Sequence, residues 1–275
     1  MQGNKNIRIV SLAPSVTSIL LGLGAGRELV GVSRWCKDVA DVGNLPTVGD
    51  CWRLDTAEVM KLKPTIVVGS VPFAPETVAK ILEQPVAFLA INPRTLADIE
   101  SDIRTLGRLV NRPARAEGLI AKMQKAFSLA QRAADTIPAS RRPRVYCEAW
   151  SNPRISSPLW VEEMVETAGG ISVIPAGQRV TDEQIADANP DVIVLAWAAT
   201  GDKAKPATAL KNPAWVDVSA IRNKRAFVIR DELLNTPGPP LATGVQELQK
   251  IFRRFAAENV PTSKKSSAGR SRVPG

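Results

Sequence analysis

The stretch RPARAEGLIAKMQKAFSLAQRAA, residues 112–134, decides the fold class. Beyond its opening proline only Gly118 interrupts it, and apolar residues such as Leu119 and Met123 recur at spacings of four and three. This pattern predicts one helix of roughly 20 to 25 residues, about 30 Å long at 1.5 Å per residue. A proline-punctuated segment, residues 136–143, follows it. We interpret the helix as a connector between two lobes.

On both sides of this helix, short apolar runs typical of buried strands alternate with helix-period stretches. Such alternation predicts an α/β fold, here two Rossmann-like lobes with mostly parallel sheets joined by a single long α-helix. The expected strands are 8–12, 29–32, 65–68, 86–91, 144–147, 191–195 and 226–229, and the expected helices between them are 17–23, 56–62, 75–82, 96–110 and 159–168. The expected domains are an N-terminal lobe at 1–111, the connecting helix and linker at 112–138, a C-terminal lobe at 139–258 and a disordered basic tail at 259–275.

The two halves also resemble each other. Residues 57–68 and 183–194 align without gaps, and each is a helix stopped before a proline and followed by a buried strand. This repetition in equivalent positions on either side of the long helix indicates two similarly built lobes.

Composition excludes most catalytic chemistry. The chain has no histidine, which removes the usual general base, the Ser-His-Asp triad and His-ligated metals. Three cysteines, Cys36, Cys51 and Cys147, are an odd count without CxxC spacing, so they cannot form a four-thiolate site. A Cys36–Cys51 pair remains open. We expect neither a metal site nor a catalytic cofactor.

Charge and hydropathy bound the partners and the compartment. Lys264, Lys265, Arg270 and Arg272 supply +4 of the net charge of +9, and the tryptophans lie apart from the charged runs. No nucleic-acid partner is therefore expected. No apolar run is long enough to span a bilayer. The opening residues do not match a secretory signal, which predicts a cytoplasmic chain or one that has lost its leader.

Tryptophans mark a candidate cleft. Ligands of open α/β sheets bind beyond the carboxyl ends of the strands, where most of the tryptophans fall. This placement favours a cleft lined by indoles, with interlobe packing as the open alternative for each. Five of the six tryptophans fall in such loops or turns: Trp35, Trp52, Trp150, Trp160 and Trp197.

Polar loop residues gather at the same strand ends and suit a bulky, partly apolar ligand. Arg34 and Arg154 could pair with ligand carboxylates or phosphate, or be solvated loop charges. The binding candidates besides the tryptophans are Pro14, Ser15, Cys36, Asp50, Asn152, Arg154 and Asn235, and Ser70, Ser156, Ser157 and Thr200 lie in the same loops.

The order of motifs resembles the substrate-binding proteins of bacterial ABC importers for vitamin B12 and iron-siderophores. The resemblance covers roughly residues 7–256 and is most specific in its first motif. It rests on RIVSLAPSVT at 8–17 with Leu20, Gly24 and LVGV at 29–32, LKP at 62–64, VETAGG at 165–170, NPDVI at 189–193, residues 223–228 and the prolines of 237–240.

This resemblance implies a monomeric, non-catalytic protein that binds a large metal chelate between its lobes, most closely cobalamin or another corrinoid. Trp35, the Cys51–Trp52 loop, Trp150 and Trp197 would then face the corrinoid. The family also implies an acidic residue on each lobe that docks on the transporter. Glu183 matches in the second lobe, whereas the first-lobe position is Ala57 with Glu58 beside it. The family further implies a periplasmic or membrane-associated location.

Two alternatives remain. An anionic ferric siderophore or a haem-type ligand is favoured by the positive charge and by Arg34, Arg154 and Arg179. An intracellular enzyme that processes corrinoids or metal chelates would use Cys36, Asp50 or Glu148. Neither a base nor a cofactor motif supports that enzyme.

Overall fold

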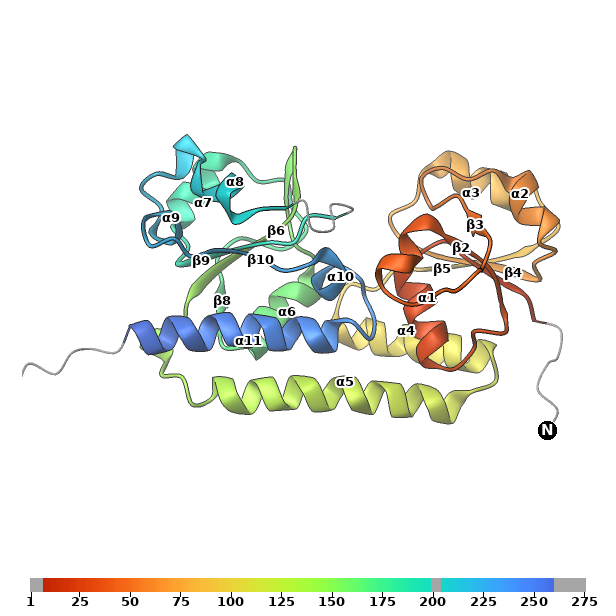
Figure 1. Ribbon diagram of the computed structural model, residues 1–275, viewed down its shortest axis with the longest axis horizontal. Coiled ribbons are helices and arrows are strands. Elements are labelled where there is room, and N and C mark those ends of the chain that lie inside the picture. The colour runs from red at the N-terminus through yellow and green to blue at the C-terminus, as the bar shows by residue number, and fades with distance from the viewer. Residues whose placement is uncertain (1–6, 199–203, 260–275) are drawn as a thin grey trace, which may run out of the picture.

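The computed structural model describes residues 7–198 and 204–259, which form two α/β lobes above a layer of helices (Figure 1). The sheet of the first lobe is parallel throughout, in the order β3-β2-β1-β4-β5. Its strands are β1 (Ile9–Ser11), β2 (Leu29–Ser33), β3 (Thr47–Val48), β4 (Ile66–Ser70) and β5 (Ala87–Ile91). The helices are α1 (Pro14–Gly22), α2 (Thr56–Lys61), α3 (Pro75–Leu82) and α4 (Leu96–Leu109), with a 3-10 turn η1 (Arg34–Asp38) after β2.

The second lobe has a mixed sheet in the order β10-β9-β6-β7, and β8 also pairs with β6. Only the β6–β7 pair is antiparallel among the described strands of this sheet. The strands are β6 (Arg144–Ser151), β7 (Arg154–Ser156), β8 (Ile171–Ser172), β9 (Val192–Leu195) and β10 (Ala226–Val228). Around them lie η2 (Ala139–Arg141), α6 (Leu159–Thr167), α7 (Asp182–Ala188), α8 (Pro206–Leu210), η4 (Pro213–Trp215), α9 (Ser219–Arg222), α10 (Asp231–Leu234) and α11 (Leu241–Glu258).

The connecting helix α5 (Pro113–Ala134) runs beneath both lobes (Figure 1). Pro113 occupies the first turn, where a missing backbone N–H does no harm. Its buried face carries mainly alanine with Ile120 and Met123, and it packs against α4, α6 and α11. Small side chains on this face let the neighbouring helices approach closely. One apolar cluster consequently runs through the first lobe, the helix layer and the second lobe.

The helix-proline-strand repeat is visible in both lobes. α2 and β4 in the first lobe correspond to α7 and β9 in the second. Each helix is followed by a left-handed residue directly before a proline: Lys63 has φ of 48° and Asn189 has φ of 41°. This tight turn stops the helix and sends the chain into the central part of each sheet.

The predicted fold class is confirmed: both lobes are α/β, their sheets are mostly parallel, and one long helix joins them. The predicted runs did not include the short strands β3, β7 and β8 or the helix α11. The division of the chain at residues 111, 138 and 258 stays a prediction, and the apolar cluster continues across the first two of these boundaries. Thr200 and nearly all of the predicted basic tail lie outside the described residues. No helix within residues 7–198 and 204–259 combines the length and apolarity needed to cross a membrane.

Candidate ligand-binding cleft

A cavity of about 660 Å³ lies between the two lobes, beyond the carboxyl ends of the first sheet's strands. A volume of this size is within the usual range for small-molecule sites. The first lobe supplies its lining from Leu12, Ala13, Pro14, Ser15, Trp35, Lys37, Asp38, Asp50, Cys51, Trp52, Ser70, Val71 and Pro72. The second lobe supplies Ala198, Arg230, Asp231, Glu232, Asn235, Thr236 and Pro237.

Asp50 organises the wall that the first lobe presents. Its carboxylate accepts hydrogen bonds from Trp35 Nε1 and from the backbone N–H groups of Trp52 and Arg53, each at 3.0 Å. The Arg34 guanidinium lies 3.8 Å from the same carboxylate and 4.5 Å from the centre of the Trp35 ring. Asp50 is only 8% exposed, whereas Trp52 is 61% exposed at the rim. The loop between β3 and α2 is thereby fixed with one indole in the wall and another at the opening.

The start of α1 forms the floor on the same side. Pro14 is the first residue of the helix and Ser15, which is buried, follows it. The N-cap Ala13 has no side chain that could accept from the first backbone N–H groups. The positive end of the helix dipole therefore faces the cavity.

The second lobe contributes the segment around α10. Arg230 forms an ion pair with Glu232 at 3.0 Å, and its guanidinium also donates to the Asp38 carbonyl oxygen of the first lobe at 3.5 Å. Asn235 donates from Nδ2 to the Ala196 carbonyl oxygen at 2.5 Å, while its buried Oδ1 has no hydrogen-bond partner among the described residues. These contacts place polar groups of both lobes around one opening.

The described cavity lining is richer in carboxylates than in cations. Asp38, Asp50, Asp231 and Glu232 supply four acidic groups, against Lys37 and Arg230. A lining of this kind offers acceptors for N–H donors and repels polyanions.

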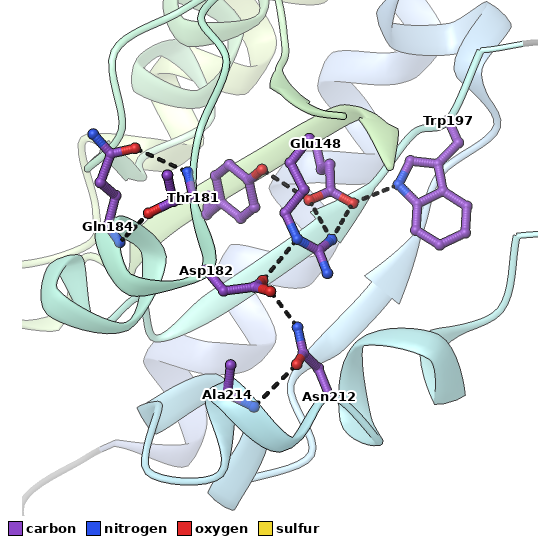
Figure 2. Close-up of polar contacts among 9 residues, drawn as sticks. Glu148, Thr181, Asp182, Gln184, Trp197, Asn212 and Ala214 are labelled. Carbon is purple, nitrogen blue, oxygen red and sulfur yellow. Dashed lines mark hydrogen bonds and ion pairs between the residues drawn. The ribbon is translucent and has the colours of Figure 1, made fainter. Parts of the chain in front are cut away.

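A buried ionic network occupies the corresponding end of the second sheet (Figure 2). Glu148 on β6 is 0% exposed and accepts from Tyr146 Oη at 2.8 Å, Arg154 Nη1 at 3.0 and 3.1 Å and Trp197 Nε1 at 2.7 Å. Arg154 also pairs with Asp182 at 2.8 Å. Burial alone would lower the pKa of Arg154, but Glu148 and Asp182 raise it. Burial, together with the neighbouring Glu148 charge, raises the pKa of Tyr146, which keeps its O–H as a donor.

Arg154 is thus committed within the protein. Its guanidinium carbon lies 4.4 Å from the centre of the Trp215 ring. Its Nη1 contacts the Glu148 carboxylate and its Nε contacts the Asp182 carboxylate. Asp182 in turn accepts from Asn212 Nδ2 at 3.1 Å. Arg154 does not line the cavity.

The other sequence-predicted residues fall into two groups. Pro14, Ser15, Trp35, Asp50, Trp52 and Asn235 are brought together at the cavity, and their binding roles stay predictions. Trp197 directly precedes the lining residue Ala198. Trp150, Trp160 and Cys36 are placed elsewhere. Trp150 is exposed on the β6–β7 hairpin and donates to the Asn152 carbonyl oxygen at 2.9 Å. Trp160 donates to the Leu234 carbonyl oxygen at 2.9 Å.

The cysteines are free thiols in the structure. Cys36 is buried against Thr17 and Ser33, with its Sγ at 3.0 and 3.2 Å from their hydroxyl oxygens, and burial raises its pKa. Burial also raises the pKa of Cys51 and of Cys147 to about 12. Among the described residues, no group of three or more His, Cys, Asp or Glu is arranged to hold a metal ion.

Several lining residues were not singled out from the sequence. Lys37 and Asp38 lie in the 3-10 turn after β2, and Asp231 and Glu232 lie in the single-turn helix α10. Short polar turns carry no periodicity that would reveal them. Pro237 belongs to the proline-rich segment that supported the family resemblance, and this was the one available signal.

Glu58 and Glu183, the predicted docking residues, are exposed in the first turns of α2 and α7. Both helices lie on the upper side of their lobes in Figure 1, away from the helix layer. The pKa of Glu183 is lowered, first by a hydrogen bond with the Thr181 side chain.

The chain is similar to known proteins over most of its length. An uncharacterized ABC transporter substrate-binding lipoprotein, YvrC of Bacillus subtilis (strain 168), is 27% identical over 251 residues, covering 88% of this chain and 78% of that protein. A vitamin B12-binding protein of Vibrio cholerae serotype O1 (strain M66-2) is 24% identical over 252 residues, covering 88% and 87%.

The apo form of the periplasmic heme-binding protein RhuT from Roseiflexus sp. RS-1 superposes with a TM-score of 0.77 at 27% identity, covering 91% of this chain and 99% of that one. The model of the family described as periplasmic binding protein matches residues 9–233, which is well over half of the chain. Two lobes, one connecting helix and a cavity between the lobes agree with that match. The chain therefore belongs to the periplasmic binding protein family.

Proposed function

We propose that this protein is the substrate-binding component of an ABC-type importer and that it holds a corrinoid, cobalamin or a close analogue, between its lobes. The observation that carries the proposal is the cavity itself, with Trp35 in its wall and Trp52 at its rim. Indole faces suit the broad apolar surface of a corrin ring. Relatives named as vitamin B12-binding proteins support the same choice.

The charge of the cavity favours a corrinoid over polyanionic chelates. Cobalamin carries many peripheral carboxamides, whose N–H groups can donate to carboxylates such as Asp38 and Asp231. Haem presents propionates and many ferric siderophores are anionic, so the acidic excess in the lining opposes both.

Axial ligation gives a second reason. The chain has no histidine, and its single tyrosine, Tyr146, is buried and hydrogen-bonded to Glu148. Cys51 reaches the cavity, but with a pKa of about 12 it is a protonated thiol at neutral pH. A metal that enters already ligated, as cobalt does in cobalamin, requires none of these groups.

Haem or a ferric siderophore is the second candidate ligand. The two cations of the lining, Lys37 and Arg230, are the observation that favours it. The heme-binding solved structure with a similar fold points the same way.

The binding test compares substitutions in the cavity. Trp35→Ala and Trp52→Ala are each expected to weaken cobalamin binding tenfold or more, the rough size of a large aromatic contact. Lys37→Ala is the matched control in the same lining and is expected to leave the cobalamin Kd within about twofold. A large loss on Lys37→Ala with little change on either tryptophan substitution would instead favour the anionic chelates.

Transporter docking is the second part of the proposal. Glu58 and Glu183 are exposed in the first turns of α2 and α7, equivalent helices that lie on the same side of the two lobes, so one partner spanning both lobes could contact them. Charge reversal of both, Glu58→Arg with Glu183→Arg, is expected to abolish ligand uptake in cells while the Kd of the purified protein stays unchanged. Normal uptake by the double variant would contradict docking through these residues.

We place the protein in the periplasm or on the membrane surface as a lipoprotein, acting as a monomer without catalysis. The family and the lipoprotein relative support that location, and nothing in them supports a cytoplasmic one. The candidate catalysts are committed elsewhere: Cys36 is a buried thiol with a raised pKa, and Asp50 and Glu148 are held in hydrogen bonds.

A further inference from the structure

Each lobe holds one indole by a hydrogen bond to a buried carboxylate. In the first lobe, Trp35 Nε1 donates to Asp50 at 3.0 Å. In the second lobe, Trp197 Nε1 donates to Glu148 at 2.7 Å. Trp35 and Asp50 line the cavity, whereas Trp197 packs against the apolar cluster of the second lobe and only the next residue, Ala198, lines the cavity. The two lobes therefore share the same arrangement, in the cavity wall of the first lobe and one residue before the lining in the second.

An arginine accompanies each pair. Arg34 lies 3.8 Å from Asp50 and stacks over the Trp35 ring, whereas Arg154 lies 3.0 Å from Glu148 and stacks over Trp215. A carboxyl group has two oxygens with several acceptor sites, so it can contact a guanidinium and an indole N–H at the same time. Each carboxylate thus joins an arginine and an indole of its own lobe.

Further donors fix the carboxylates themselves. Asp50 accepts from two backbone N–H groups of its own loop, and Glu148 accepts from the hydroxyl of Tyr146. An indole has a single donor, so a rigid acceptor at that donor limits rotation of the ring plane. Figure 2 shows the Trp197 ring at the outer edge of its network, with its Nε1 donating to Glu148.

We propose that Asp50 and Glu148 are positioning residues that hold Trp35 and Trp197 in the orientation that receives the ligand. This inference rests on the proposed function, since it concerns the same cleft. The carboxylates act by preorganising the indoles, so that little side-chain freedom remains to be lost when the ligand binds. Freeing one indole is expected to raise Kd roughly tenfold.

A double-mutant cycle separates positioning from direct contact with the ligand. Asp50→Asn is measured with Trp35 and with Trp35→Phe, which keeps a ring but lacks the donor. Glu148→Gln is measured with Trp197 and with Trp197→Phe in the same way. The readout is the Kd for cyanocobalamin, and Trp160→Phe is the control background, because the Trp160 indole donates to the Leu234 backbone carbonyl rather than to a carboxylate and does not line the cavity.

Positioning predicts that each carboxylate substitution raises Kd roughly tenfold in the tryptophan background and less than twofold in the phenylalanine background. Equal losses in both backgrounds would mean that the carboxylate contacts the ligand or only supports the fold, and would overturn the inference. No loss in either background would overturn it as well. If Glu148→Gln does not fold, Glu148→Asp serves instead, because it keeps the charge that faces Arg154 but withdraws the acceptor from the indole.

A measurement without ligand keeps this inference distinct from the proposed function. In ligand-free protein labelled with 5-fluorotryptophan, the ¹⁹F resonances of Trp35 and Trp197 are expected to shift and broaden in the Asp50→Asn and Glu148→Gln variants respectively. Unchanged resonances would contradict positioning. If the wild-type protein binds no corrinoid while the two variants show these spectral changes, the proposed ligand is refuted and the positioning role stands.

Discussion

The Glu163 carboxylate on α6 of the second lobe accepts a hydrogen bond, at 2.7 Å, from the backbone N–H of Leu96, the first residue of α4 in the first lobe. A side chain of one lobe thus satisfies an unpaired donor at the helix start of the other. With the shared apolar cluster beneath both sheets, this bond ties the lobes at the base of the cleft. We therefore expect a small closure motion on ligand binding.

Removing this bond tests how strongly it joins the lobes. Glu163→Ala leaves the Leu96 N–H without its acceptor, and is expected to lower the free energy of unfolding by about 1 kcal/mol and Tm by about 2 to 3 °C. Glu166→Ala, at an exposed position of the same helix, is the control and is expected to change stability by less than about 0.5 kcal/mol. Equal Tm values for the two variants would show that the bond contributes nothing.

Two helical glycines should respond to alanine in opposite directions. A Cβ at Gly244 in α11 would collide with the Leu233 carbonyl oxygen of α10, so Gly244→Ala is expected to destabilise the protein by about 1 to 3 kcal/mol. Gly118 in α5 has open space where a Cβ would be, and Gly118→Ala is expected to stabilise by about 1 kcal/mol through helix propensity. The thermal unfolding of both variants measures these changes. A Gly244→Ala protein as stable as the wild type would contradict the close packing of α10 on α11.

Asp102 on α4 predicts a pH-dependent stability. Burial, assisted by the nearby charge of Asp98, raises its pKa from 3.8 to about 6, and within the described part of the chain its Oδ2 has no hydrogen-bond partner. The folded state therefore holds a proton that the unfolded state releases first, so this group's contribution to stability falls as pH rises from about 4 to about 6. Asp102→Asn is expected to stabilise the protein by about 1 kcal/mol at pH 7, with solvent screening allowed for, and by nothing below about pH 4.

Denaturant unfolding at pH 4 and pH 7 checks this dependence. Asp98→Asn on the same helix is the opposite control, because Asp98 accepts from the backbone N–H groups of Arg94 and Thr95 and its pKa is lowered. Its removal should destabilise the protein at pH 7. If Asp102→Asn increased the free energy of unfolding equally at pH 4 and pH 7, the raised pKa of Asp102 would be contradicted.

Cys51 should react slowly and be shielded by ligand. Since burial raises its pKa from 9.0 to about 12, its thiolate fraction at pH 8 is roughly a thousandfold below that of an ordinary thiol. Alkylation followed by peptide mass spectrometry is expected to show a rate that rises with pH and falls further when cobalamin is bound, because Cys51 lines the cavity. Cys147, with a similarly raised pKa but outside the lining, is the control. Ligand-independent labelling of Cys51 would contradict a ligand seated in this cavity.

Much of the fold could be predicted, because local patterns in the sequence correspond to helices and strands of the structure. The spacing of Leu119, Met123 and their neighbours predicts α5, and the helix-proline-strand repeat predicts the likeness of the lobes. The strands β7 and β8 escape prediction because they are too short for a period. The helix α11 was missed although its buried residues, Leu241, Val245, Leu248 and Phe252, follow helical spacing.

The candidate site was predictable only in part, for a physical reason. Trp35 and Trp52 follow strand ends, and topology alone brings such loops to the cleft. Arg154 was expected to be available to a ligand, but its guanidinium is taken by Glu148 and by Asp182, which lies 28 residues away in sequence. Partners so distant are set by tertiary packing, which periodicity and spacing do not encode.

The most direct test of the central claim is a titration of the purified protein with cyanocobalamin, haemin and a ferric siderophore in parallel, followed by tryptophan fluorescence and calorimetry. The account predicts that cobalamin binds with a micromolar or lower Kd, quenches the fluorescence and binds at least tenfold more tightly than the two other ligands. Absence of cobalamin binding at micromolar concentrations, or tighter binding of haemin or the siderophore, would contradict it.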